Sequence, residues 1–161
     1  MIPTLIELLI NTATFLLAVF GCLIIGALTL NNPPLSDPPG FFVRLRTYLT
    51  TNSAETKPNH PFPELELPRV AIAPGLLLTR IELTVDILDW EIVEVDARNF
   101  ELHAVVETSL FRFKDDVFVK LNPTPAGTEM HIRASSRVGR GDFGANTRHI
   151  LDLLTMLRRQ V

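Results

Sequence analysis

The chain begins with a long apolar run. From Thr12 to Leu30 every residue is apolar, small or hydroxyl-bearing, and none is charged. Such a run matches the hydrocarbon core of a membrane, about 30 Å thick, so residues 1–30 are predicted to form a membrane anchor helix. A cleaved signal peptide would have a basic segment before a shorter apolar stretch, whereas Glu7 is the only charge before this run. The pattern therefore favours an uncleaved, single-pass anchor.

Small side chains recur along one face of this predicted helix. Ala18, Cys22 and Gly26 follow one another at every fourth position. Residues at this spacing share one side of a helix, and small side chains there let a second helix approach closely. We therefore predict a packing face for other integral membrane protein subunits. Small residues are common in membrane helices, so chance spacing is the alternative.

A proline-rich stretch separates the anchor from the rest of the chain. Residues 31–40 read NNPPLSDPPG, and prolines bar a continued helix, so residues 31–56 are predicted to be a linker with an interfacial segment. The following FFVRLRTYL sets aromatic side chains beside basic ones, which is typical of a helix at a membrane surface. It is equally compatible with the first core-packing turn of the domain. The residues expected at the interface are Phe41, Phe42, Arg44 and Arg46.

These two arginines also bear on orientation. Basic residues near a membrane helix tend to stay on the cytoplasmic side. The arginines are the nearest basic residues on either flank of the apolar run. They predict that the domain faces the cytoplasm.

Residues 57–161 are predicted to form one globular domain. Apolar spacing indicates helices at residues 74–88 and 145–159, and alternation of apolar and polar positions indicates strands between them. The expected strands lie at residues 90–96, 100–113, 117–121 and 130–134. The alternation changes parity near residues 108–110, which predicts a bend there.

The order of helix, strands and helix predicts an α+β fold. Short successive strands without helical crossovers favour an antiparallel sheet of about four strands, covered on one face by two helices. Aromatic side chains are expected in the core, although an open sheet beneath a helix would instead leave a hydrophobic pocket. They are Trp90, Phe100, Phe111, Phe113, Phe118 and Phe143.

Composition mainly argues against certain kinds of partner and site. A length of 161 residues leaves room for one domain. The net charge of -3 gives no general attraction to nucleic acid, so nucleic acid is not expected as a partner. Cys22 is the only cysteine and the four histidines are scattered, so neither a disulfide framework nor a metal site is expected. No cofactor is expected either.

Two polar segments, FRFKDDVFVK and HIRASSRVGRGDFGANTRHI, carry the most chemical information. From His131 to Arg137, polar residues alternate with apolar ones, so the polar side chains project from one face of a strand. If the preceding strand pairs with this one, acids at its start lie near these arginines. We therefore predict a structural ion-pair network of Asp115, Asp116, Asp142, Arg137 and Arg140.

Two motifs within these segments resemble a known family. They are Arg112-Phe113-Lys114-Asp115-Asp116-Val117 and Arg133-Ala134-Ser135-Ser136-Arg137-Val138-Gly139-Arg140-Gly141-Asp142-Phe143-Gly144-Ala145-Asn146. The chain is similar to the family called domain of unknown function 1499, over roughly Pro58 to Leu157. The resemblance implies a bacterial or plastid-type protein, commonly behind an N-terminal membrane or export segment, with no established activity. Members often have Pro-Asn-Cys where this chain has Pro58-Asn59-His60, so no role of that cysteine carries over.

The glycines of the second motif suggest one kind of binding and exclude another. Gly139 to Gly144 match the G-x-G-x-x-G pattern, but a dinucleotide fold needs a further parallel strand that is not expected before Val161. Backbone amides at a helix N-terminus, together with arginines, can instead hold an anion or a lipid headgroup. The residues predicted for this site are Arg133, Arg137, Gly139, Arg140, Gly141 and Arg148.

No catalytic residue is assigned. Ser135 and Ser136 lack an elbow motif, and no histidine is placed by the sequence as their base. The leading expectation is a non-enzymatic accessory or scaffold protein of a larger complex in a bacterial inner membrane or an equivalent membrane. The alternative is a binding module for an anionic ligand or a lipid headgroup through the Arg/Gly cluster, and a hydrolase is third.

Overall fold

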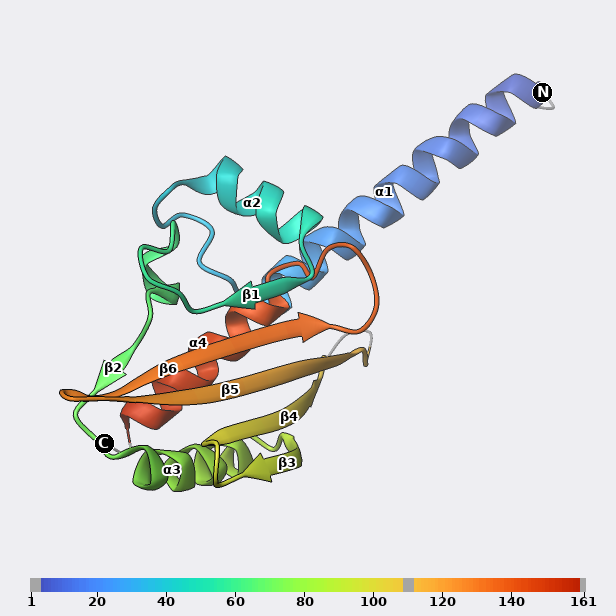
Figure 1. Ribbon diagram of the computed structural model, residues 1–161. Coiled ribbons are helices and arrows are strands. Elements are labelled where there is room, and N and C mark those ends of the chain that lie inside the picture. Colours follow the sequence, from blue (N-terminus) through green and yellow to red (C-terminus); the bar gives the residue numbers. More distant parts are fainter. Residues whose placement is uncertain (1–3, 109–111, 160–161) are drawn as a thin grey trace.

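The computed structural model describes residues 4–108 and 112–159 (Figure 1). A long apolar N-terminal helix precedes a domain with an antiparallel sheet and helices, which confirms the α+β prediction. The helices are α1 (Leu5–Asn31), α2 (Phe41–Thr50), the short 3-10 helix η1 (Pro63–Leu65), α3 (Pro74–Ile87) and α4 (Ala145–Arg158). The strands are β1 (Ser53–Glu55), β2 (Arg69–Val70), β3 (Glu91–Asp96), β4 (Glu101–Glu107), β5 (Lys114–Thr124) and β6 (Gly127–Ser136).

The sheet of the described residues has six strands in place of the expected four or so. Its order is β1-β6-β5-β4-β3, and β2 also pairs with β6. The four strands predicted from alternation form the antiparallel meander from β3 to β6. The two additional strands span three and two residues. They are too short for an alternating pattern to reveal them.

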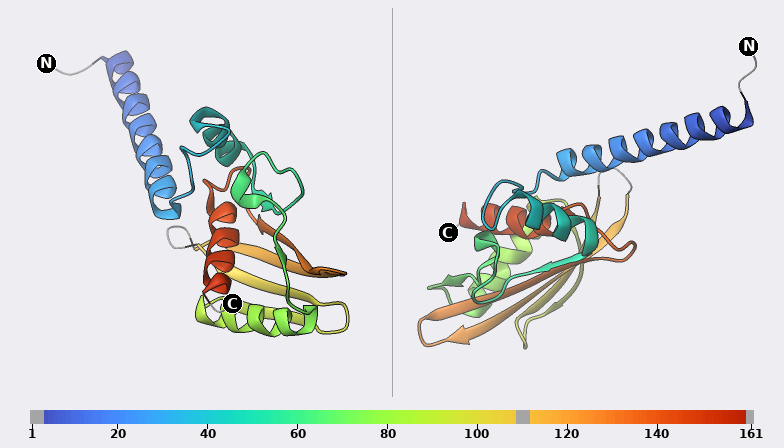
Figure 2. Two further views of the ribbon diagram at one scale, coloured as in Figure 1. Left: turned by 90° about the vertical axis from the view of Figure 1, so that its left-hand side faces the viewer. Right: turned by 90° about the horizontal axis from the view of Figure 1, so that it is seen from above.

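The core lies between one face of the sheet and helices α3 and α4 (Figures 1 and 2). Both helices begin at the predicted residues and end within a residue of the predicted ends. Each places an apolar stripe on the sheet, as the helical spacing predicts. The stripe residues of the two helices are Leu77, Ile81, Val85, Ile150, Leu153, Leu154 and Leu157.

Helix α1 is long and apolar enough to cross a membrane. Its 27 residues give a length of about 40 Å. A capping box formed by Thr4 and Glu7 begins the helix, and Asn32 ends it in a left-handed conformation. The helix extends away from the domain in every view of Figures 1 and 2, and only its last turns touch the domain. Ala27 is its one buried residue among those described.

The domain begins earlier than the predicted boundary at residue 57. Strand β1 lies inside the predicted linker and pairs with β6. Tyr48 of α2 is fully buried and belongs to the core cluster. The linker assignment of residues 31–56 is therefore wrong for β1, whose three residues are too few to show a pattern. The burial of Tyr48 fits the alternative that this segment is the first core-packing turn of the domain.

One detail of the strands was not predicted, and one prediction falls outside the described residues. In β3, the pairing register with β4 shifts between Ile92 and Glu94, which the alternation did not predict. The bend expected near residues 108–110 falls mostly outside the described residues, and so does Phe111.

Candidate ligand-binding site

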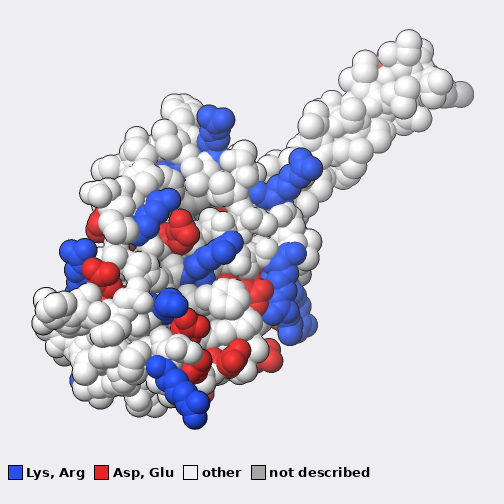
Figure 3. Space-filling view, viewed as in Figure 1, with Lys and Arg blue, Asp and Glu red and all other residues white. Residues whose placement is uncertain are grey.

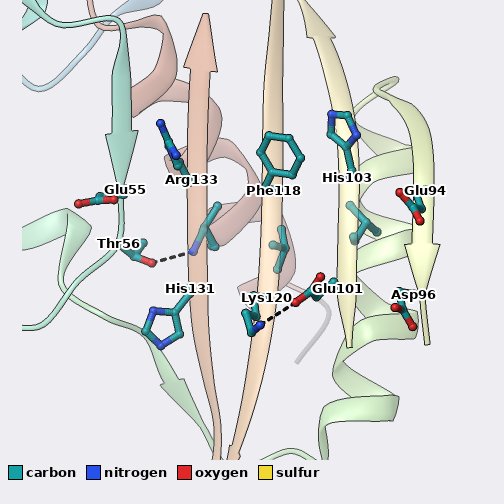
Figure 4. A pocket seen from close by; sticks show the side chains of 13 residues that line it. Glu55, Thr56, Glu94, Asp96, Glu101, His103, Phe118, Lys120, His131 and Arg133 are labelled. Carbon is teal, nitrogen blue, oxygen red and sulfur yellow. Dashed lines mark hydrogen bonds and ion pairs between the residues drawn. The ribbon is translucent and has the colours of Figure 1, made fainter. Parts of the chain in front are cut away.

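The sheet face away from α3 and α4 is open and carries polar side chains (Figure 4). His131 and Arg133 project to this face, while the residues between them are buried on the other, as predicted. The ring of Phe118 stacks on His103 with a centroid distance of 4.2 Å. A hollow of about 400 Å³ lies over these strands.

Lys120 and Glu101 form an ion pair on this open face. Figure 4 shows Lys120 directed toward Glu101, and the Nζ–Oε1 distance is 2.7 Å. Glu94 and Asp96 of β3 add further acidic groups beside it. All four side chains are at least partly exposed, so water solvates them and they need no ligand. We therefore do not take this face as the candidate site.

Asp116 and Arg137 form the strongest ion pair at the end of the open face. Arg137 donates from Nε to Oδ2 at 2.8 Å and from Nη2 to Oδ1 at 2.7 Å. His103 Nε2 lies 2.8 Å from Oδ1. The hydrogen bonds from Arg137, and next those from His103, lower the pKa of the Asp116 carboxyl to about 2. The predicted pairing of Asp116 with Arg137 is confirmed.

This pair predicts a pH-dependent contribution to stability. The folded pKa of Asp116, about 2, is below its ordinary value of 3.8, so the contribution is present above pH 3.8 and is lost as the pH falls through about 2. Asp116→Asn is expected to lower the free energy of unfolding by about 1 kcal/mol at pH 6, because Arg137 is half exposed. The effect should shrink at pH 2.5. Urea unfolding of detergent-solubilised protein, followed by Trp90 fluorescence, measures it, and a pH-independent difference contradicts it.

The rest of the predicted ion-pair network does not form. Asp115 precedes Asp116, and neighbouring strand residues point to opposite faces, so Asp115 is buried beneath α4. The Asp142 carboxylate accepts from amides within its own loop and pairs with no arginine among the described residues. Arg140 is exposed, and the described residues offer it no ion pair. The prediction was wrong for these three residues.

A cavity of about 300 Å³ lies between the end of α1 and the domain, and we call it the α1 cavity. Ala27 and Asn31 of α1 form one wall. The loop from β6 to α4 and the start of β5 form the rest, with Phe113, Val138 and Phe143 among the apolar lining residues. The alternative that some aromatic residues line a pocket thus holds for Phe113 and Phe143 here and for Phe118 on the open face.

A fully buried carboxylate lines the α1 cavity. Asp115 Oδ2 lies 3.0 Å from His149 Nε2 of α4. Asp115 Oδ1 is buried and accepts no hydrogen bond from the described residues. His149 faces a neighbouring hollow of about 420 Å³, where its ring meets Trp90 edge-on at 5.8 Å. The two hollows share Asn31 and Thr108, so the Asp115–His149 pair lies where they meet.

Asp142 organises the loop that forms the far wall of the cavity. Its carboxylate accepts from the backbone N–H of Gly144 at 2.8 Å and from Asn146 Nδ2 at 2.8 Å. Asn146 Nδ2 also contacts Asn52 O and Ser136 Oγ. Burial raises the pKa of Asp142, while the hydrogen bonds from Gly144 and Asn146 oppose that rise. Asp142 thus satisfies the backbone N–H of Asn146 in the first turn of α4, while Gly144 is the N-cap residue of the helix.

The hydrogen bonds of Asp142 at the start of α4 explain why the predicted anion site is not assembled. The N-terminus of α4 already has the Asp142 carboxylate on its amides, so an incoming anion would meet a negative charge. Gly141 packs so closely against Leu49 that an added Cβ would lie 2.4 Å from the Leu49 carbonyl oxygen. Close packing is therefore the role that the structure gives this glycine.

The arginines of the predicted anion site point to different places. Arg133 lines the open face, Arg137 pairs with Asp116, Arg140 lines the α1 cavity beside Gly139, and Arg148 pairs with Asp152 at 2.7 Å. They come from a strand, a loop and a helix whose relative positions depend on the tertiary fold. The prediction that they converge on one ligand was wrong.

The core-packing interpretation of α2 is confirmed for one face, and the membrane-interface interpretation stays a prediction for the other face, with one correction. Phe41, Phe42 and Arg46 are exposed, as an interfacial helix requires. Arg44 is fully buried and pairs with Glu64, so its assignment to the membrane interface was wrong. One helical turn after Arg44, Tyr48 is buried on the same side of the helix. One face of α2 packs on the domain and the other is open.

The small-residue face of α1 stays a prediction. Ala18 and Cys22 are exposed, and Gly26 is half-buried. A Cβ added at Gly26 would meet nothing within 4 Å. This part of α1 is free for another helix to approach, but no second helix packs on it among the described residues.

The side chains of the α1 cavity offer few reactive groups. In the described ranges, no serine, threonine or cysteine side chain is hydrogen-bonded to His149. No three His, Cys, Asp or Glu side chains among the described residues are grouped to hold a metal ion. What the cavity does offer is a buried hydrogen-bond acceptor between apolar walls.

Sequence reasoning missed His149, Asn146 and Asn31. A signal for the first two was present, because they share the buried stripe of α4 with Ile150 and Leu153. Polar residues on an otherwise apolar helix face are buried only with partners, so they mark a polar network. Asn31 gave no such signal, because it lies at the boundary between an apolar run and a proline-rich segment.

The fold and the cavity define a class: a small α+β domain behind a long apolar helix, with a hollow where the two meet. The chain belongs to the family described as "Protein of unknown function (DUF1499)", whose model matches residues 36–157. The resemblance read from the motifs is therefore confirmed, and the match extends further toward the N-terminus, so it includes α2 and β1.

Other comparisons add little to this assignment. A search of curated proteins found no match to the chain. Among solved structures, the chain is similar to the one described as "Crystal structure of Ara h 8.0201", with 11% sequence identity and a TM-score of 0.44. That alignment covers 67% of this chain and 95% of the other. A likeness at this level carries no argument about function.

Proposed function

We propose that this protein is a membrane-anchored accessory protein that acts by binding and catalyses no reaction. The junction between α1 and the domain carries the proposal. Asn31 Nδ2 donates to the carbonyl oxygen of Phe143 at 3.1 Å, and Ala27 is buried against the domain. Leu28 packs against the core as well. Cleavage of α1 as a signal peptide would remove these contacts, so an uncleaved anchor accounts for them better.

The surface of α1 supports a membrane environment. The helix is white along the length seen in Figure 3, because Glu7 near its far end is its only charged residue. Large apolar side chains such as Leu5, Phe15 and Leu17 are more than 60% exposed. Exposed apolar surface costs about 25 cal/mol per Å² in water, so this helix gains stability when lipid or another helix covers it.

Helix α2 supports placing the domain close to the membrane surface. It lies beside the domain-proximal end of α1 in the views of Figures 1 and 2. Phe41, Phe42 and Val43 are exposed on it, with Phe42 83% exposed. Aromatic side chains suit the headgroup region, and Arg46 can reach phosphates from there. We propose a bacterial inner membrane or its equivalent, with the domain on the cytoplasmic side.

A second apolar surface lies at the end of the domain away from α1. Leu83 and Ile87 of α3 are more than half exposed, and β3 beside it exposes Val93 and Val95 (Figure 1). Strand β3 is also an edge of the sheet. Contiguous exposed apolar groups on a folded domain favour a protein partner. We name the exposed residues of α3 and β3 the distal patch, and propose that it contacts another subunit.

Purification from the native membrane tests this function. Tagged full-length protein in nanodiscs is expected to carry a stoichiometric membrane protein partner, identified by mass spectrometry. Leu83→Arg should remove that partner, because a charge in the distal patch is not compatible with an apolar interface. Thr155→Arg, at an exposed position of α4, is the matched control and should retain it. Protein that purifies alone, or a partner equally retained by both variants, contradicts the proposal.

A further inference from the structure

We propose that the α1 cavity binds an amphipathic molecule whose head donates hydrogen bonds, best met by an ammonium group, and whose apolar chain lies beside α1. The inference rests on the proposed function only for access from the bilayer. The ligand preference itself comes from side chains that line or surround the cavity. The anion site predicted from the sequence shares Gly139, Arg140 and Gly141 with this lining, but it implied a ligand of the opposite charge.

The first observation is the unpaired half of the Asp115 carboxylate. Asp115 is fully buried, and one of its oxygens faces His149. The other oxygen, Oδ1, accepts no hydrogen bond from the described residues. A buried acceptor left unpaired is unfavourable, because it has lost its hydrogen bonds to water, so the fold gains stability when a donor reaches it. Asp115 lines the α1 cavity, which is the space from which such a donor can come.

A second unpaired acceptor belongs to Asn146, which follows the lining residue Ala145. Asn146 Oδ1 is buried and has no hydrogen-bond partner among the described residues. Asn146 is not one of the lining residues, so Asp115 supplies the acceptor for the head of the ligand. An ammonium group suits this acceptor, because it is a donor without an acceptor of its own.

The charges around the cavity favour a cation over an anion. Asp115 and Asp142 bring carboxyl groups to it, and both are buried. Arg140 is the basic residue that lines it, and its side chain is exposed, where water screens its charge. An anionic head would therefore face buried acids and be disfavoured, whereas an ammonium head would pair with Asp115.

The walls of the α1 cavity favour a ligand with an apolar chain. Phe113, Val138 and Phe143 line the cavity together with Ala27 of α1. Its volume of about 300 Å³ lies at the small end of the range for ligand pockets. A short alkyl chain with one polar head fits this description, and the chain would lie against the end of the helix that we place in the membrane.

The test uses full-length protein in phosphatidylcholine nanodiscs and two probes with the same chain, hexylammonium and hexanoate. Isothermal titration, with empty nanodiscs subtracted, gives each Kd, and Trp90 fluorescence near His149 gives a second readout. Hexylammonium is expected to bind saturably and about tenfold or more tighter than hexanoate. Ethylammonium should bind about tenfold or more weaker than hexylammonium, because it lacks most of the chain.

Asp115→Asn provides the decisive comparison. An asparagine can accept from His149 with its oxygen and turn its amide N–H groups to the cavity, so the preference for hexylammonium should disappear and hexanoate should gain. Val138→Phe, which narrows the cavity without touching Asp115, should weaken hexylammonium about tenfold. Thr155→Phe, at an exposed position of α4 outside both the cavity and the distal patch, is its control and should not.

Three outcomes would overturn the proposal: no saturable hexylammonium binding, equal affinity for hexylammonium and ethylammonium, or Val138→Phe binding as the wild type does. Without saturable hexylammonium binding, an ordered water would be the donor to Asp115 Oδ1. With equal affinity for hexylammonium and ethylammonium, the ligand would be a small soluble amine that needs no apolar chain. None of these outcomes affects the partner test at the distal patch, because Leu83 and the cavity lie on different elements. The failure of one proposal is therefore distinguishable from the failure of the other.

Discussion

Glu64→Gln is expected to lower the free energy of unfolding by about 3 kcal/mol, although Glu64 lies in a short surface turn. The reason is Arg44, whose side chain is 0% exposed. Its Nη2 donates to Glu64 Oε2 at 2.8 Å, its Nη1 contacts Tyr48 Oη at 3.1 Å, and its guanidinium lies 4.3 Å from the Phe62 ring centroid. Removing the carboxylate leaves a buried positive charge without a compensating negative one, which is far more costly than losing an exposed pair.

Two controls distinguish this mechanism from a general sensitivity of the turn. Arg44→Met combined with Glu64→Leu should recover most of the loss, because apolar groups can replace a buried ion pair at little cost. Glu55→Gln, which removes an exposed pair with Lys57, should change the free energy of unfolding by about 0.5 kcal/mol or less. Chemical denaturation followed by Trp90 fluorescence measures all three. An equal, small effect of Glu64→Gln and Glu55→Gln would show that Arg44 is not dependent on its partner.

Asp142→Ala is expected to be comparably destabilising, by about 3 kcal/mol, because it removes the acceptor for a buried set of donors. The carboxylate accepts from the N–H of Gly144 and from both the N–H and the side-chain amide of Asn146. Without it, the backbone N–H groups of Gly144 and Asn146 lose their acceptor at the start of α4, while Asn146 Nδ2 keeps its contacts with Asn52 and Ser136. The loop is also the one that accepts hydrogen bonds from Asn31, so the junction with α1 should loosen as well.

The pH dependence of this effect has a definite sign. Burial raises the folded pKa of Asp142 above its ordinary value of 3.8. A raised pKa means that its contribution to stability is fully present below pH 3.8 and declines as the pH rises through the folded pKa. The difference between wild type and Asp142→Ala should therefore be larger at pH 4 than at pH 8. A difference that grows with pH would contradict the burial of this carboxyl.

A matched control for Asp142→Ala is available on α4 itself. Asp152 is partly exposed and pairs with Arg148 one turn earlier. Asp152→Ala should change the free energy of unfolding by about 0.5 kcal/mol or less, since exposed helix pairs contribute little. A similar loss of unfolding free energy for both aspartates would mean that removing any acidic side chain destabilises α4. The hydrogen bonds that Asp142 accepts would then not be the cause.

Parts of the candidate site could be predicted because they depend on local periodicity. Alternation along β6 placed Arg133 and Arg137 on the open face, and pairing through the β5–β6 turn brought Asp116 to Arg137. The same rule, applied strictly, would have sent Asp115 to the opposite face, since the two acids are adjacent. That error put Asp115 in an ion-pair network and hid its role beneath α4.

Other parts depend on which elements pack together, and periodicity carries no information about that. Arg44 looked like a membrane-surface residue because its neighbours are aromatic, but its partner Glu64 lies 20 residues away in a segment without periodicity. The pairing of Asp115 with His149 joins residues 34 positions apart on a strand and a helix. Such contacts exist only once the helix has docked on the sheet.

The sequence by itself determined the long apolar N-terminal helix, the two amphipathic helices, the meander from β3 to β6 and the family. Each of these is encoded in composition, local spacing or a contiguous motif. Tertiary structure alone decided that α2 belongs to the domain, that Asp142 occupies the helix terminus expected to hold an anion, and that Asn31 closes a cavity over Asp115. The physical reason is that burial and pairing of a polar group depend on residues far away in the chain, whose approach no local pattern records.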